Sequence, residues 1–274
     1  MRDGAVRSVQ VFLIRASDAA KGQPMRARVA NRKGRSRQRR VVHRELLQID
    51  GRSVEMSVKL NPRARRLIVK VHPTTGEVSV TAPSKRALDR AVEFARGERD
   101  WIARQLARVP SRVVLVPGVR IPFRGEDHLI LRDADERGVT IDEDKSIIRV
   151  GGRAEHAPRR LQDFLKRRAR LEVETRSFEF AARIGAKPRR VTVRDTASRW
   201  GSCSTTRSLS YSWRLILAPP FVLDYVVAHE VAHLREMNHG ASFWRLVREL
   251  VGDVKRPQAW LRQHGVSLHR YAPR

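Results

Sequence analysis

The chain has 274 residues and a formal net charge of +28, with 57 lysines and arginines against 29 aspartates and glutamates. This length allows one large or two modest domains with a buried core. The single cysteine, Cys203, excludes a disulfide within the chain and is typical of a reducing compartment. The longest apolar stretch, residues 215–228, contains two prolines and Asp224 and is therefore interpreted as core, with no membrane span. We recognise no signal peptide and expect a cytoplasmic protein.

The positive charge favours phosphate-bearing or other acidic partners. However, 48 of the 57 basic residues are arginine, a bias that a GC-rich genome would also produce, and few aromatic residues are interleaved with them. The densest block, residues 26–44, contains nine basic residues and no acidic one. We therefore predict that residues 1–50 form a basic, disordered tail, and nucleic acid is the candidate partner of that tail.

Residues 51–152 show the alternation of apolar and polar side chains that is typical of β-strands. The segment 72–77 has the composition of a turn and predicts a hairpin. Apolar residues at helical spacing over 84–106 predict one long helix. The strands are expected at 54–60, 67–71, 78–80, 113–116, 119–123, 128–131, 139–141 and 147–150. This region is therefore predicted to be a small, mainly antiparallel β domain that serves as a scaffold.

Residues 153–274 are predicted to form a second, helix-rich domain with a small sheet. A long helix is expected from Pro158 to near Gly185, because glycine commonly follows the end of a helix. Two strands are expected at 190–194 and 209–213, and further helices at 243–250 and 257–263. The whole chain is thus predicted to belong to the α+β class.

A pattern of histidine and glutamate in the second domain points to chemistry. In the sequence His229-Glu-Val-Ala-His233, the two histidines are four residues apart, so on a helix they lie on one face and can bind one metal ion. Glu230 lies about 100° further around the helix, where it can reach the attacking water without being a ligand. Pro219 and Pro220 mark the start of this helix, and its apolar stripe indicates an amphipathic helix with the histidines on its buried side.

His239 is the candidate third ligand. It comes too late to join the other two histidines if the helix continued, but Asn238 and Gly240 tolerate the left-handed conformation that ends a helix. A chain that turns there would return His239 to the metal. Three neutral imidazoles with one open position are typical of a catalytic zinc site, with one Zn²⁺ per chain. The alternative interpretation is a pair of hydrogen-bonded core histidines beside a surface glutamate.

Several neighbouring residues are weaker candidates. Arg199 would bind an anionic substrate group or stabilise charge near the metal, or else form a structural ion pair. Tyr225, one turn before His229, would contact the substrate or the oxyanion, or else fill the core. Cys203 is more consistent with a small buried hydrophobe than with a nucleophile or ligand. Asp195 and Asp224 are the candidates for orienting the histidines.

The motifs around these residues resemble those of the YgjP-like metallopeptidase family, a distant relative of SprT-type proteases. The resemblance covers about residues 54–265. It is carried by Arg199-Trp-Gly-Ser-Cys203, Trp213-Arg-Leu-Ile-Leu-Ala-Pro-Pro220, Tyr225-Val-Val-Ala-His-Glu-Val-Ala-His-Leu234 and Asn238-His-Gly-Ala-Ser-Phe-Trp244, with Trp101-Ile102, Val116-Pro-Gly118 and Phe123-Arg-Gly125 upstream.

The resemblance implies a zinc-dependent hydrolase of gluzincin-like architecture. It implies that His229, His233 and His239 are the zinc ligands and that Glu230 is the catalytic glutamate, acting as general base in peptide-bond cleavage. Two other functions stay open. One is a metal-dependent phosphohydrolase that acts on nucleotides or another phosphorylated small molecule. The other is a basic nucleic-acid-binding protein, or a protease recruited to DNA through its tail.

Overall fold

The computed structural model describes residues 41–196 and 199–272. The chain has two compact units that divide between Pro110 and Ser111. The smaller unit is described from residue 41 to residue 110, and the larger unit comprises the described residues from 111 onwards. Both units combine helices with small sheets, so the chain belongs to the α+β class, as its sequence predicts.

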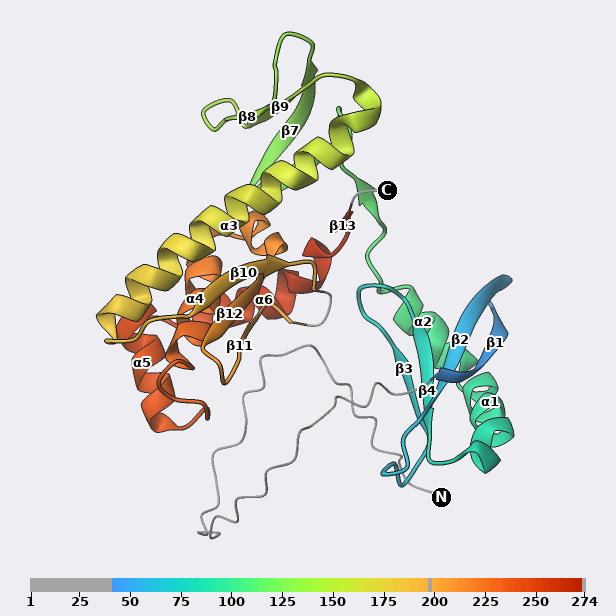
Figure 1. Ribbon diagram of the computed structural model, residues 1–274. Helices are drawn as coiled ribbons and strands as arrows, with labels where there is room; N and C mark the ends of the chain where they lie inside the picture. The colour runs from blue at the N-terminus through green and yellow to red at the C-terminus, as the bar shows by residue number, and fades with distance from the viewer. Residues whose placement is uncertain (1–40, 197–198, 273–274) are drawn as a thin grey trace. The chain divides into compact units, whose positions relative to one another are not determined.

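The smaller unit consists of a four-stranded sheet with helices packed against it (Figure 1). Its strands lie in the order β1-β2-β4-β3, in which β2 and β4 are parallel and the other pairs are antiparallel. Leu47, Met56, Val58, Val80 and Ile102 belong to its aliphatic core. The elements are β1 (Val41–Ile49), β2 (Arg52–Leu60), β3 (Ile68–Val71), β4 (Val78–Ala82), a 3₁₀ turn η1 (Lys85–Ala87), α1 (Leu88–Gly97) and α2 (Arg99–Leu106).

The structure confirms one of three sequence predictions for this unit and corrects the other two. The hairpin around 72–77 is confirmed, because β3 and β4 pair antiparallel on either side of it. The predicted tail is wrong over residues 41–49, which form β1 with Leu47 and Ile49 buried; the rest of that tail, residues 1–40, lies outside the described residues. The single helix over 84–106 is two helices, because the backbone at Glu98 (φ −94°, ψ 12°) leaves the helical conformation.

The larger unit begins with a second four-stranded sheet, in the order β6-β7-β9-β8. This sheet shares one apolar core with α3 and the segment before α4, through residues such as Ile130, Ile148, Leu161 and Trp213. The sequence prediction places the domain boundary at residue 152, whereas the compact unit already begins at 111 because of this shared core. The strands are β5 (Val113–Val114), β6 (Arg120–Phe123), β7 (Glu126–Asp133), β8 (Val139–Asp142) and β9 (Ile147–Gly151).

The rest of the larger unit contains the predicted site. A three-stranded sheet in the order β10-β12-β11 packs with α3 and α4, and β10 and β11 are its two edge strands (Figure 1). Strand β13 pairs with β5. The elements are η2 (Ala154–His156), α3 (Ala157–Arg183), β10 (Arg190–Arg194), β11 (Gly201–Cys203), β12 (Ser208–Ser212), η3 (Trp213–Leu217), α4 (Pro220–Ala232), α5 (Ala241–Val251), α6 (Lys255–Leu268) and β13 (Tyr271–Ala272).

Helix α4 is not the amphipathic helix that the apolar stripe predicts. Every residue from Val222 to Ala232 is buried except Asp224, which is half-buried. The helix is enclosed because it contacts α3, α5, α6 and the sheet edge at β11. A helix that is apolar around its whole circumference has to be buried, and here it carries His229 and Glu230 into the interior.

The described helices include none with both the length and the apolar character that a membrane span requires.

Candidate metal centre

The buried helix α4 ends earlier than its sequence suggests. It begins at Pro220, as predicted, and its last residue is Ala232, so that His233 is the C-cap residue. The backbone N–H groups of Leu234 and Arg235 then donate to the carbonyls of Val231 and Ala232, which tightens the chain into a turn. This early turn returns the chain towards α4.

The predicted left-handed turn at Asn238 and Gly240 is wrong. Neither residue has a positive φ, and Gly240 is instead the extended N-cap of α5. Residues 233–236 accomplish the reversal, because two hydrogen bonds of 3₁₀ type close it without needing a left-handed residue. The predicted consequence is nonetheless observed, since His239 lies against the two histidines of α4.

The side chains of His229, His233 and His239 come together in one cluster. Their candidate ligand nitrogens all lie within 4.8 Å of one another. Nε2 of His229 lies 3.1 Å from Nε2 of His239. Three imidazoles at this spacing are a donor set that transition metals favour, and among the described residues they form a group able to hold a metal ion.

Local contacts fix the orientation of these rings. Nδ1 of His233 lies 3.0 Å from the backbone carbonyl of Glu236, and a hydrogen bond donated from Nδ1 leaves the lone pair of Nε2 free for a metal. The ring of Phe243 packs against all three histidines, with centroid distances of 4.6–4.9 Å. The turn after α4 and the first turn of α5 therefore hold the cluster together.

The aspartates that the sequence offers for this orienting role are engaged elsewhere. Asp195 pairs with Arg214, and Asp224 pairs with Arg176. The orienting group is the main-chain carbonyl of Glu236, which side-chain motifs do not reveal because every residue has one. Only the formation of the turn brings this carbonyl to His233.

Burial keeps the three histidines neutral. Desolvation, and then the neighbouring His233 and His239, lower the pKa of His229 to about 3. Burial also lowers the pKa of His233 and of His239. Neutral imidazole is the form that binds metals, so the cluster is ready for a cation at neutral pH.

Glu230 is buried beside the cluster and is held by strand β11. The carboxylate accepts a hydrogen bond from the backbone N–H of Cys203. Burial raises the pKa of Glu230 to about 8, and the positive charge of Arg199 partly opposes this rise. An acidic group whose pKa lies near neutrality is able both to accept and to return a proton.

Gly201 leaves room for this carboxylate, a role that sequence analysis misses. A Cβ at position 201 would lie 2.5 Å from Cγ of Glu230 and 2.7 Å from its Oε1, which is closer than real contacts allow. The glycine in Arg199-Trp-Gly-Ser-Cys203 could have predicted this role, because a glycine in a strand often marks a place where the backbone lies close to another group.

The weaker candidates separate into two groups. Arg199 is exposed, and its charge acts on Glu230, so it stays a candidate for contact with a substrate. Tyr225 is fully buried, and its hydroxyl accepts a 2.9 Å hydrogen bond from Nε2 of Gln258. Tyr225 therefore fills the core in this structure, and its own hydroxyl is not accessible to a substrate.

Cys203 and the nearby tryptophans have supporting roles. Burial and the neighbouring Glu230 raise the pKa of the Cys203 thiol to about 11, which disfavours the thiolate that a nucleophile or a ligand requires. Trp200 packs against His269 and Gly265 of the α6 region, and Trp244 packs against His229 and His239. These contacts anchor β11 and α5 around the centre.

The sequence profile of the YgjP-like, metallopeptidase domain family matches residues 65–264, which is most of the chain and includes the whole histidine cluster. The chain belongs to the YgjP-like family. Membership supports a metal-dependent hydrolase and confirms the resemblance that its motifs predict. The described histidine cluster gives this YgjP-like chain a group that fits a metal.

One solved structure is similar to part of this chain. The crystal structure of the metallopeptidase zymogen of Pyrococcus abyssi abylysin is 20% identical, with a TM-score of 0.30, and the match covers 34% of this chain and 92% of that chain. No match was found among the curated proteins.

Proposed function

We propose that this YgjP-like chain is a zinc-dependent metallopeptidase that holds one Zn²⁺ with His229, His233 and His239 and uses Glu230 as its general base. The observation that carries the proposal is the convergence of three neutral imidazoles beside a buried carboxylate that a backbone N–H holds in place. A donor set of three histidines with room for a further ligand is typical of catalytic zinc.

The histidine cluster fits zinc. Zinc–nitrogen bonds are about 2.0–2.1 Å long, so nitrogens within 4.8 Å of one another need only small ring rotations to share one ion. Zinc bound there would supply a Lewis acid that polarises the scissile carbonyl and makes water a better nucleophile. The hydrogen bond from His233 to the carbonyl of Glu236 limits the loss of side-chain freedom on binding.

Glu230 would move the proton. Its carboxylate accepts a proton from the attacking water and then returns that proton to the leaving amine. The N–H of Cys203 keeps the carboxylate in place, and Gly201 permits its close approach to β11. Because Arg199 is exposed at the same carboxylate, it would bind a negatively charged group of the substrate.

The sheet edge beside Glu230 favours a peptide substrate. Strand β11 is an edge strand of its sheet and carries both Gly201 and Cys203, which lie against Glu230. An extended peptide can add to such an edge through main-chain hydrogen bonds. Arg199 is also the one described cation whose charge acts on Glu230, and one arginine is too little to neutralise a nucleoside triphosphate.

The first experiment is elemental analysis of the purified protein beside a His239→Ala variant. We expect about one zinc per wild-type chain, and a sharp loss of zinc in the variant, because two imidazoles leave the ion without its third ligand. A wild-type protein that contains no zinc and takes up none when zinc is added would overturn the proposal.

The second experiment compares substrates. The zinc-loaded protein is incubated with casein and, in parallel, with nucleoside triphosphates, and Glu230→Gln is the control for each activity. Cleavage of casein that disappears in Glu230→Gln supports the peptidase. Hydrolysis of nucleoside triphosphates that depends on Glu230, with casein left intact, would instead identify a phosphohydrolase.

A further inference from the structure

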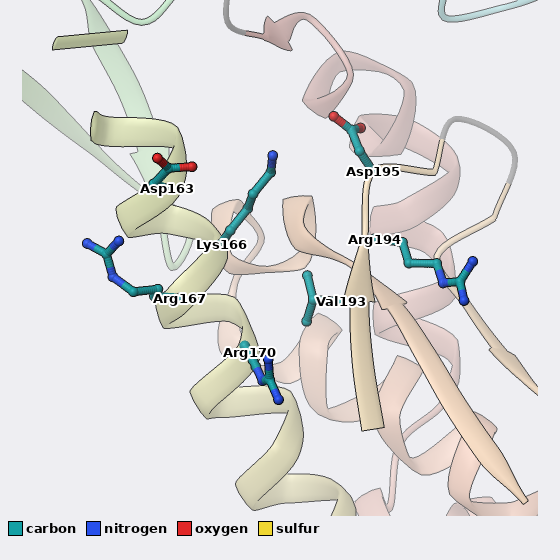
Figure 2. A pocket seen from close by; sticks show the side chains of 7 residues that line it. All are labelled: Asp163, Lys166, Arg167, Arg170, Val193, Arg194 and Asp195. Carbon is teal, nitrogen blue, oxygen red and sulfur yellow. The ribbon is translucent and has the colours of Figure 1, made fainter. Parts of the chain in front are cut away.

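A pocket of about 410 Å³ lies between helix α3 and strand β10 of the larger unit. Figure 2 shows its lining side chains, which come from one face of α3 and from the end of β10. This basic pocket is lined by Asp163, Lys166, Arg167, Arg170, Val193, Arg194 and Asp195. None of these residues belongs to the histidine cluster or contacts Glu230 in the described structure.

Four of the seven lining residues are cations, and each of the two carboxylates has an arginine partner outside the pocket. Asp195 pairs with the buried Arg214, and Asp163 lies 3.8 Å from Arg159, although neither arginine lines the pocket. Within the described residues, Lys166, Arg167 and Arg194 make no ion pair and no side-chain hydrogen bond, although the charge of Lys166 helps to lower the pKa of Asp195. These three cations are therefore available to an anionic ligand.

The cations are spread out and do not converge on one point. In Figure 2, Lys166 extends into the gap between α3 and β10, while Arg167 projects away on one side and Arg194 projects away on the other. Because the two arginines project to opposite sides, they do not surround a single phosphate. An extended polyanion that crosses the pocket would place successive phosphates beside each cation.

The apolar lining of the pocket gives further information about the ligand. Val193 is its one apolar lining residue, and no aromatic side chain lines it. A small-molecule site usually encloses its ligand with apolar and aromatic side chains, and base recognition usually needs a stacking partner. A pocket with four cations and no aromatic side chain matches the phosphodiester backbone, which carries the sequence-independent part of nucleic-acid binding.

We infer that the basic pocket between α3 and β10 binds the phosphodiester backbone of nucleic acid, without sequence preference, through Lys166, Arg167 and Arg194. This site lies within the folded larger unit and is distinct from the basic tail that the sequence suggests as a nucleic-acid contact. The inference does not rest on the proposed peptidase activity, because it uses none of the residues of the metal centre.

The test uses the full-length chain and a short fluorescent DNA duplex, with binding measured by anisotropy over a series of salt concentrations. The test variant combines Lys166→Ala, Arg167→Ala and Arg194→Ala. The matched control combines Lys255→Ala, Arg137→Ala and Arg248→Ala, which removes the same charge from exposed residues of the same unit that form no ion pair within the described structure. Circular dichroism checks that both variants are folded.

We expect wild type and control to bind DNA with the same dependence on salt. In the pocket variant, the slope of log K against log salt should fall by about 0.9 for each phosphate that is no longer neutralised, or about 2.7 for three phosphates. Equal weakening in both variants, or no change in the pocket variant, would overturn the inference, because binding would then come from net charge or from another surface.

Three competitors distinguish nucleic acid from other anions. Inorganic phosphate and a nucleoside triphosphate should displace the duplex only at concentrations where simple salt does so, because neither spans the separated cations. Polyglutamate should compete less well than unlabelled DNA at the same charge concentration. Displacement by low concentrations of the triphosphate, or stronger binding of polyglutamate than of DNA, would contradict the assignment.

Discussion

The cores of the two units differ in what they bury. Between residues 41 and 110, the buried polar residues are Ser57 and Thr81, and the rest of that core is apolar. The described part of the larger unit also buries ionisable side chains, among them Arg214, His229 and Glu230. Burying such groups is costly unless they are paired or have a function.

In the larger unit, one of these buried groups keeps a charge that is paired, whereas burial favours the neutral form of the other two. Arg214 pairs with Asp195 and its guanidinium lies over the ring of Trp213 at 4.7 Å, so its charge is compensated. Glu230 is only partly compensated, by Arg199 and the N–H of Cys203, and the charges near His229 are those of other histidines. Burial therefore moves the pKa values of His229 and Glu230 in the direction that removes charge from each. The comparison indicates that the smaller unit is built for packing, whereas α4 of the larger unit carries groups whose burial serves chemistry.

The largest effect is expected from Glu230→Gln. This change keeps the shape of the side chain and removes the proton acceptor, so turnover on a peptide substrate should fall by about 10²–10⁴-fold. Zinc content should stay near one per chain, because Glu230 is not a proposed ligand. Elemental analysis and a casein assay measure the two quantities, and Glu249→Gln on the exposed face of α5 is the control. Full activity in Glu230→Gln would exclude the proposed mechanism.

The packing role of the smaller unit is tested by Ile102→Ala. Ile102 is fully buried in α2, so this truncation should lower the free energy of unfolding by about 2–5 kcal/mol. Urea denaturation measures the change. Zinc content under native conditions should be the same as in wild type, since Ile102 belongs to the core of the smaller unit. A loss of zinc in the folded variant would show that the two cores are not separate in function.

A pair of glycine substitutions compares the units directly. Gly201→Ala would place a methyl group against Glu230, so we expect a destabilisation of about 1–3 kcal/mol together with reduced turnover. Gly97 ends α1, and a methyl group added there would have no neighbouring atom within 4 Å, so Gly97→Ala should stabilise by up to about 1 kcal/mol and leave turnover unchanged. Thermal unfolding and kcat measurements test both. Similar effects at the two positions would contradict the difference between the units.

The smallest effect concerns the rate at which Cys203 is alkylated. Because burial and Glu230 raise the pKa of its thiol to about 11, the reactive thiolate is scarce at neutral pH. The rate of reaction with iodoacetamide should therefore be slow at pH 8 and should rise about tenfold for each pH unit up to pH 10, until the thiol ionises. A rate that levels off near pH 9, as for a free thiol, would show that this side chain is more solvated than the structure indicates. Unfolded protein in urea is the reference.

Local sequence determined the elements of the site but left their surroundings open. The spacing of His229 and His233 and the prolines before them predicted a helix with two ligands on one face, because helix geometry depends only on local hydrogen bonds. His239 was also predicted correctly as a member of the cluster. The turn that returns it was not, since residues 233–236 close it through main-chain hydrogen bonds that many sequences can form.

The errors in the fold have a related cause. Strand β1 lies next to a dense run of arginines, so composition hid the alternation of Leu47 and Ile49, which acquires meaning only when β2 pairs with it. The parallel pairing of β2 with β4 joins strands that are separated by β3, and the complete burial of α4 requires neighbours on every side. Such pairings depend on contacts between distant segments, which local periodicity does not encode.

The sequence by itself therefore determined the three histidines that cluster, the glutamate beside them and the family of this protein. Tertiary structure alone decided that the carbonyl of Glu236 orients His233 and that Tyr225 is buried in the core. It likewise decided that Gly201 leaves room for Glu230 while the N–H of Cys203 holds its carboxylate. It also decided where α3 and β10 place their cations. The physical reason is that side-chain identity fixes which chemistry is available, whereas burial, backbone hydrogen bonds and charge separation arise only when distant segments pack together.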